Sequence, residues 1–230
     1  MRIVISLLTI LAVSFPAHAR VTAYLTGSAA DVMPALHGPV LNLGGGGTDI
    51  DAALQEMIDQ ARGCTGAGLA IQGEFVYDAC VASATSVDVL ANPYHRSATF
   101  TRGFFNWPFM SDTLTDSHFV ARDRMGRLMG FLARQIQDGY ATTALGVAVD
   151  EETSVVVDKN GMAKVMGNGT DYFVLADHTP EQCVAKRPMS FSDYRIWKVG
   201  PGQTFDLAKR PELGAYTISV NNGVLSGNPY

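Results

Sequence analysis

Cysteine is scarce in this sequence, which has three in 230 residues: Cys64, Cys80 and Cys183. Three cysteines can form only one disulfide bond and leave a third thiol over. None of them stands in a C-x-x-C pair or beside histidines at the spacing of a zinc site. The sequence therefore predicts no metal centre, and it leaves the pairing of the cysteines open.

Basic charge is also scarce. Lysine and arginine number 17 against 22 aspartates and glutamates, so the formal net charge is −5 at pH 7. Proteins that bind nucleic acid present a basic patch or stripe to the phosphates, and no such stripe runs along this chain. We therefore expect no nucleic-acid partner. The apolar share of 47% and charged share of 17% are typical of a globular protein that buries a core.

Long apolar runs are confined to the start of the chain. After Met1 and Arg2, the residues from Ile3 to Phe15 are apolar or small, and a small-residue segment then ends at Ala19. The run of about 13 residues is shorter than the ~20 that a membrane-spanning helix needs. This pattern is typical of a secretory signal peptide. We expect residues 1–19 to be removed, with no membrane partner afterwards and a periplasmic or extracellular mature protein.

A glycine-rich loop lies near the start of the mature chain. Residues 39–43 form a short apolar run, residues 44–47 are four glycines, and apolar residues then recur at helical spacing as far as Ala61. A strand, a loop and a helix in this order are how an open α/β sheet begins. The glycines do not have the spacing of a nucleotide-binding loop. We interpret them as a tight turn that can offer backbone N–H groups to an oxyanion.

The stretch from Asp112 to Arg134 carries the strongest chemical pattern. His118 closely follows Asp116, and arginines come after it at positions 122, 124 and 127. From Met125 onward the apolar residues have the i, i+3, i+4 spacing of a helix with one buried face. An imidazole beside guanidinium groups suits chemistry on an acidic substrate. A surface histidine with solvated arginines has the same spacing, so the pattern alone leaves both interpretations open.

The segment from Asp116 to Leu128 resembles the D-x-H-F-x-x-R-x-R-x-x-R-L signature of cyanophycinase-like serine peptidases, which are relatives of peptidase E. Residues 42–49, 67–70 and 146–153 are similar to other stretches of that family. The resemblance implies a fold akin to class I glutamine amidotransferases. We therefore expect an α/β three-layer sandwich with a mostly parallel sheet in residues 20–153. Short β-runs separated by glycine and proline predict a β-rich C-terminal part in residues 154–230.

The resemblance also implies roles for individual residues, with neither metal nor organic cofactor. His118 would be the general base of a serine catalytic triad. The side chains that would hold an aspartate-rich peptide or isopeptide substrate are Asp116, Ser117, Arg122, Arg124 and Arg127.

The chain departs from the family where the nucleophilic serine should stand. The family has a G-T-S-A-G turn there, and the corresponding residues from Cys64 read C-T-G-A-G, so Gly66 takes the place of the serine. The helix that ends near Arg62 leaves no room for the preceding strands, because a parallel crossover takes a dozen or more residues. We interpret this as an internal deletion. Thr65 carries a hydroxyl, but a neighbouring position in a tight turn points elsewhere.

The third member of the triad is not identified by the sequence. Asp88 lies in the expected interval and is equally well explained as a helix-capping acid. Asp150 and Glu151 follow an apolar run at residues 145–149, and we interpret them as structural acids because no histidine is near them in the sequence. We also predict a buried helix over residues 67–81 and a hairpin over residues 154–165.

Three functions remain possible from the sequence. The first is a serine-type hydrolase with impaired activity, since a histidine without a hydroxyl to deprotonate has nothing to activate. The second is a non-catalytic protein that keeps the arginine pocket for acidic peptides. The third is a deletion product that folds poorly, because each lost Å2 of apolar burial removes ~25 cal/mol.

Overall fold

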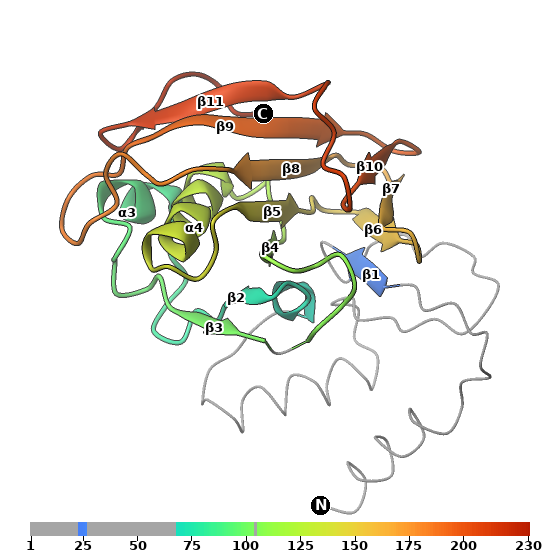
Figure 1. Ribbon diagram of the computed structural model, residues 1–230, viewed down its shortest axis with the longest axis horizontal. Coiled ribbons are helices and arrows are strands. Elements are labelled where there is room, and N and C mark those ends of the chain that lie inside the picture. The colour runs from blue at the N-terminus through green and yellow to red at the C-terminus, as the bar shows by residue number, and fades with distance from the viewer. Residues whose placement is uncertain (1–22, 27–67, 104) are drawn as a thin grey trace, which may run out of the picture.

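The computed structural model describes residues 23–26, 68–103 and 105–230 (Figure 1). The predictions for the signal peptide, the glycine loop at residues 44–47 and Gly66 lie outside these ranges. The described elements, in chain order, are β1 (Ala23–Thr26), the 3-10 helix η1 (Gly68–Ile71), β2 (Phe75–Tyr77), α3 (Ser86–Ala91), β3 (Phe100–Arg102), β4 (Thr113–Asp116), α4 (Met125–Gln137), β5 (Ala144–Ala148), β6 (Thr153–Val157), β7 (Met162–Gly167), β8 (Asp171–Ala176), β9 (Phe191–Val199), β10 (Thr204–Asp206), β11 (Tyr216–Asn221) and β12 (Val224–Leu225).

A large mixed sheet organises the described residues, with the strand order β12-β11-β9-β8-β5-β4-β2-β3. Only the β2–β4 and β4–β5 pairs are parallel, and the other pairs are antiparallel. The prediction of a mostly parallel sheet is therefore wrong for the described residues. Parallel pairing needs a long crossover, and the connections that contain α3 and α4 supply it. After β5 the strands of the large sheet pair with their partners in the antiparallel sense.

The two faces of this sheet are covered differently. Helices α3 and α4 lie against one face, and a small sheet with the order β1-β6-β7-β10 packs on the other (Figure 1). Alternate residues of β5 show the division: Ala144 and Ala148 join the helix-side core, whereas Leu145 and Val147 join the core beneath the small sheet. Because both faces are covered, β5 is apolar throughout. The three-layer sandwich with a parallel sheet is not confirmed, since the described α-helices, α3 and α4, cover one face only and the small sheet covers much of the other.

Helix α4 begins at Met125, as the spacing of its apolar residues predicts, and is buried along most of its length. It packs closely on α3 through a glycine: a Cβ at Gly130 would lie 2.2 Å from Cγ1 of Val89. The start of the helix has no side-chain cap from its own residues. Instead, Tyr230 and Ser86 supply the hydroxyls that accept from its first backbone N–H groups, at 3.0 and 3.1 Å.

Of two further predicted elements, the structure confirms one and contradicts the other. The hairpin over residues 154–165 is confirmed by β6 and β7, which pair on either side of the turn at residues 158–161. The helix predicted over residues 67–81 is wrong, because that segment forms η1 and then β2. A short apolar run fits a strand as well as a helix, and β2 is held in place by pairing with β3 and β4.

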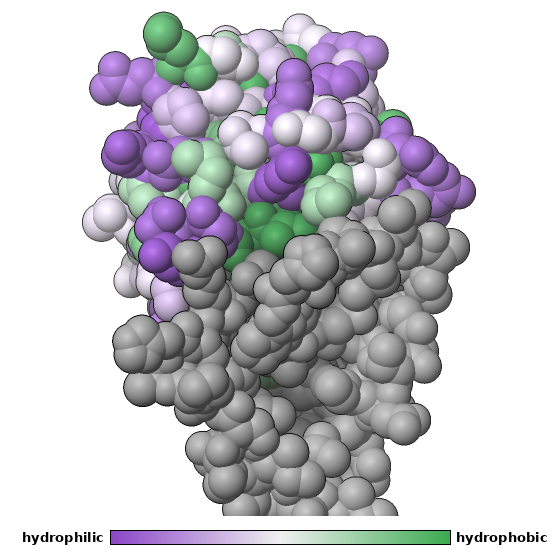
Figure 2. Space-filling model, turned by 90° about the vertical axis from the view of Figure 1, so that its right-hand side faces the viewer, coloured by the Kyte–Doolittle hydropathy of each residue, from purple (hydrophilic) through white to green (hydrophobic). Residues whose placement is uncertain are grey.

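Strands from both sides of the predicted boundary at residue 153 share the large sheet, since β5 pairs with β8. The division into residues 20–153 and 154–230 stays a prediction. On the side of β6, β7 and β10, Figure 2 shows that hydrophilic and near-neutral residues cover most of the described surface, with a smaller apolar area. No described helix has the length and hydrophobicity needed to span a bilayer.

Candidate functional site

A cavity of about 190 Å3 opens at the carboxyl end of β4. Strand β4 and the loop that leads to α4 supply most of its wall. All six residues that the sequence singled out lie around this cavity: Asp116, Ser117, His118, Arg122, Arg124 and Arg127. The structure therefore brings together every residue of the predicted site, whose individual roles stay predictions.

His118 lies just beyond β4, with a backbone φ of 47°. Its Nδ1 is 2.8 Å from Oε1 of Glu151, and the two side chains are 26% and 48% exposed. Glu151 follows β5, the parallel neighbour of β4. The carboxyl ends of adjacent parallel strands lie at the same edge of a sheet, which explains why residues far apart in the sequence meet here.

The premise that no histidine lies near Glu151 is therefore wrong, and the role of this acid stays a prediction. A signal for this contact was present in the sequence: polar residues follow two buried strands, His118 after β4 and Glu151 after β5, and parallel strands of one sheet bring the residues at their carboxyl ends together. Asp88, the other candidate acid, caps α3 instead. Its carboxylate accepts from Thr85 N at 3.1 Å, and hydrogen bonds from Thr85 lower the pKa of Asp88.

The contact with Glu151 has a consequence for the imidazole ring. A carboxylate accepts a hydrogen bond, so in the neutral ring it favours the proton on Nδ1 and leaves the lone pair on Nε2. No hydrogen-bond partner of Nε2 is found among the described residues. An imidazole oriented by an acid, with its second nitrogen open, has the form of a general base.

Asp116 and Arg127 form a buried pair at the base of the cavity. Arg127 Nε donates to Asp116 Oδ2 at 2.8 Å and Nη2 donates to Oδ1, with side chains only 4% and 6% exposed. The remaining guanidinium nitrogen donates to the Ala84 carbonyl at 3.2 Å and to the Ser83 hydroxyl at 3.3 Å. These contacts use most of the hydrogen-bonding capacity of both side chains, so the pair shapes the cavity wall.

Arg124 is partly engaged in the same network. Its Nη1 donates to the Ser117 carbonyl at 2.6 Å and lies 3.3 Å from Asp116 Oδ1, and its side chain is 11% exposed. Burial lowers the pKa of this guanidinium, and the attraction of Asp116 opposes the shift. Arg124 remains a cation at neutral pH and faces the cavity.

Arg122 differs from the other two arginines. It is exposed, it lines the cavity, and no carboxylate partner for it is found in the part of the chain that the structure describes. Within the cavity wall, three guanidinium groups accompany the single buried carboxylate of Asp116. The excess of positive charge suits an anionic ligand, and Arg122 has the most freely available guanidinium.

The hydroxyl groups of the cavity wall contact groups other than the His118 ring. The Ser117 and Ser83 hydroxyls accept from Arg124 at 3.4 Å and from Arg127 at 3.3 Å. Tyr77 donates to the Ala82 carbonyl at 3.1 Å, and Thr115 donates to the Leu69 carbonyl at 2.5 Å. Among the described side chains, none but Glu151 hydrogen-bonds to the His118 ring. The described part of the site thus contains an imidazole in contact with a carboxylate, and no described hydroxyl or thiol is hydrogen-bonded to the ring.

The cysteines and the possibility of a metal site were also open questions from the sequence. Cys183 is a free, buried thiol, and burial raises its pKa to about 12, whereas Cys80 is disulfide-bonded. In residues 68–103 and 105–230, no group of three or more His, Cys, Asp or Glu side chains is arranged to hold a metal ion.

Comparisons with known proteins agree with the sequence signature over part of the chain. No protein-family model matches. Cyanophycinases from Trichormus variabilis and Nostoc sp. are each 32% identical over 108 residues, which cover 45% of this chain and 34% of the relative. A cyanophycinase from Geminocystis herdmanii is 26% identical over 99 residues, covering 41% of this chain and 34% of the relative. The chain thus matches about a third of the length of these curated relatives, and the similarity supports a cyanophycinase-like family.

Proposed function

We propose that this protein is a cyanophycinase-like serine-type hydrolase whose cavity at the end of β4 binds an aspartate-rich peptide, and whose turnover is weak or absent. One observation carries the proposal: His118, paired with Glu151, lies in the same cavity as the cations Arg122 and Arg124. The similarity to cyanophycinases supports the reaction class.

The proposed division of labour follows from the contacts. Arg122 and Arg124 bind substrate carboxylates, because planar guanidinium groups pair with carboxylates through two parallel hydrogen bonds. Glu151 orients His118, whose Nε2 would take a proton from an attacking hydroxyl. Asp116 does not touch the substrate in this scheme but holds Arg127 and Arg124 in position.

Weak turnover follows from the residue at the nucleophile position. Gly66 has no hydroxyl, so His118 has no proton to remove there. We attribute this change to the internal deletion inferred from the sequence near residues 62–67. Secretion is also part of the proposal and rests on the signal-like residues 1–19.

A non-catalytic binding protein is the second candidate function. It is favoured by the lack of any described hydroxyl or thiol in contact with the His118 ring. Binding through Arg122 does not depend on a nucleophile, so this function survives even if turnover is zero.

Binding is tested with a fluorescein-labelled aspartate-rich peptide and the full chain. Loss of a charge-assisted hydrogen bond costs ~1.5–3 kcal/mol, so Arg122→Gln should weaken binding by about tenfold or more. The matched control is Arg187→Gln, which removes another exposed arginine outside the cavity wall. Equal affinities of wild type and Arg122→Gln, or no binding by the wild type, would refute the proposed binding function.

A further inference from the structure

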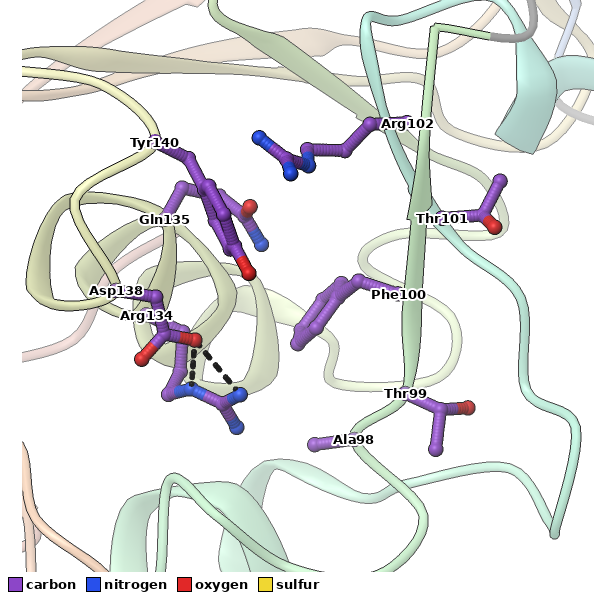
Figure 3. A pocket seen from close by; sticks show the side chains of 9 residues that line it. All are labelled: Ala98, Thr99, Phe100, Thr101, Arg102, Arg134, Gln135, Asp138 and Tyr140. Carbon is purple, nitrogen blue, oxygen red and sulfur yellow. Dashed lines mark hydrogen bonds and ion pairs between the residues drawn. The ribbon is translucent and has the colours of Figure 1, made fainter.

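A second cleft, of about 590 Å3, lies between β3 and the end of α4. This volume is in the range of small-molecule and peptide sites. Figure 3 shows Arg102 reaching from β3 toward Tyr140, with Gln135 and Phe100 pointing into the space between the two elements. None of the six site residues that were predicted from the sequence lines this cleft.

Arg102 gives the cleft an unpaired positive charge. Its guanidinium carbon lies 3.4 Å from the centre of the Tyr140 ring, and Arg102 is exposed. No carboxylate partner of Arg102 is found among the described residues. A guanidinium stacked on an aromatic face keeps its N–H edge free, and that edge matches a carboxylate.

The other charges of the cleft cancel one another. Arg134 donates to Asp138 Oδ2 through Nε at 3.0 Å and Nη2 at 2.9 Å. Asp138 also accepts from the Tyr94 hydroxyl at 2.5 Å. Arg102 therefore carries the net charge of the cleft, and an anion is the complementary ligand.

Gln135 supplies an unpaired side-chain carbonyl oxygen in the same cleft. The residue is 1% exposed and lines the cleft, and no hydrogen-bond partner of its Oε1 is found in the described structure. Buried polar groups are normally hydrogen-bonded. A carboxamide offers both a donor and an acceptor, which is the complement of a peptide group.

The end of α4 explains how these groups come together. Gly139 has a φ of 75°, the left-handed conformation that ends helices, and Tyr140 N then donates to the Gln135 carbonyl at 2.9 Å. This turn places Tyr140 beside the last turn of the helix, where its ring meets Arg102. Phe100 forms an apolar side of the cleft and packs edge-on against Phe131, with ring centres 5.1 Å apart.

We propose that this cleft is a second binding site for acidic peptide, in which Arg102 binds a side-chain carboxylate and the Gln135 carboxamide pairs with the adjacent peptide group. The site is separate from the candidate catalytic cavity. Arg124 precedes α4 at the first cavity, and Gln135 lies near the other end of the helix. The 13 residues of α4 rise about 20 Å.

The probe is N-acetyl-triaspartate amide, which spans about 10 Å when extended and is too short to contact both sites at once. Binding is followed on the full chain through the Hε–Nε NMR signals of its arginines. The signal of Arg102 is assigned by its disappearance in Arg102→Gln. We expect it to shift and saturate in the wild type and equally in Arg122→Gln and Arg187→Gln.

Two changes should weaken this shift. The uncharged N-acetyl-triasparagine amide should bind at least about tenfold more weakly than the aspartate peptide, because it lacks the carboxylates. Gln135→Leu should weaken triaspartate binding while the variant still melts cooperatively, because only the partner of the peptide group is removed.

Three outcomes would overturn the second site. These are an Arg102 signal that stays in place during the titration, equal binding of the aspartate and asparagine peptides, and an equal response to sodium acetate, which would indicate a site for a lone carboxylate. If only the Arg122 signal moves, the second site is wrong and the first stands. If only the Arg102 signal moves, the first site is wrong and the second stands.

Discussion

Three arginines that are equivalent in the sequence pattern differ in what they contact. Arg127 is fixed by Asp116 in a buried pair, Arg124 donates to the Ser117 carbonyl, and Arg122 is exposed at the cavity. Spacing along the chain brings all three near the site. It cannot say which guanidinium is paired, because that depends on where the end of β4 places a carboxylate. Arg122 therefore has the most available guanidinium of the three, and for this reason the proposed function assigns it a substrate carboxylate.

At the scale of single residues, Glu151→Gln should change which nitrogen of the neutral His118 ring carries the proton. The wild-type carboxylate accepts from Nδ1 and keeps the proton there. A glutamine can instead donate to Nδ1, so the population with the proton on Nε2 should rise. The ring 15N chemical shifts, measured at a pH where the imidazole is neutral, report the two populations.

Glu152→Gln is the control for this change. It removes a neighbouring exposed carboxylate whose recorded side-chain contact is with Asn168 at 3.1 Å. Its His118 signals should match those of the wild type. If Glu151→Gln also leaves the ring signals unchanged, the His118–Glu151 contact does not set the tautomer.

At the scale of elements, the end of β4 and helix α4 are joined by a buried ion pair. Asp116 is the last residue of β4, and Arg127 is in the first turn of α4. The helix has no acidic residue in its first turn and no side-chain cap of its own. Its position therefore depends on contacts with other elements, which also set the place of the arginines around the cavity.

Breaking this pair should destabilise the fold strongly. Asp116→Asn leaves Arg127 as a buried cation without a carboxylate, which costs ~3–5 kcal/mol in other proteins. The free energy of unfolding, measured by urea denaturation, should fall by about that amount. Arg122→Gln, at an exposed position of the loop between β4 and α4, should change the free energy of unfolding by less than ~0.5 kcal/mol. An Asp116→Asn variant as stable as the Arg122→Gln variant would contradict the structural role of the pair.

Some elements could be predicted from the sequence and others could not. Helix α4 was predictable because its apolar residues keep helical spacing over 13 residues, and the β6–β7 hairpin because Asn160-Gly161 marks its turn. The strand β2 was missed because three residues carry no periodicity that separates strand from helix. The contact of Glu151 with His118 was missed because the two residues follow different strands, and only the pairing of β4 with β5 brings them together.

At the scale of the whole molecule, strand order decides the architecture, and sequence alone did not give it. Pairing of β5 with β8 is antiparallel, so the C-terminal strands extend the sheet that carries the candidate site. The sequence of β8 alone does not indicate that β5 is the strand beside which it pairs. The described residues nevertheless bury apolar side chains on both faces of the sheet. A cooperative melting transition would therefore count against the poorly folding deletion product.

Stability of the whole fold should fall at alkaline pH. Burial, with the Asp138 hydrogen bond second, raises the pKa of Tyr94 to about 12, and burial raises that of Tyr216 to about 12. Unfolded tyrosines ionise near their usual value of about 10. Between about pH 10 and 12 the folded state thus holds more protons, so stability falls as pH rises.

The urea midpoint, measured at about pH 9 and about pH 11, tests this alkaline effect. The midpoint should be lower at the higher pH, and Tyr216→Phe should show a smaller drop than the wild type. Equal midpoints at both pH values in the wild type would contradict the raised tyrosine pKa values.

Hydrolysis of an aspartate-rich peptide, measured for the purified full chain beside His118→Ala, tests the central claim most directly. That claim is that the cavity holds a base and its orienting acid without a nucleophile for them to activate. We predict that the chain binds the peptide and that its cleavage rate equals that of His118→Ala. Rapid cleavage by the wild type that is lost in His118→Ala would contradict the claim.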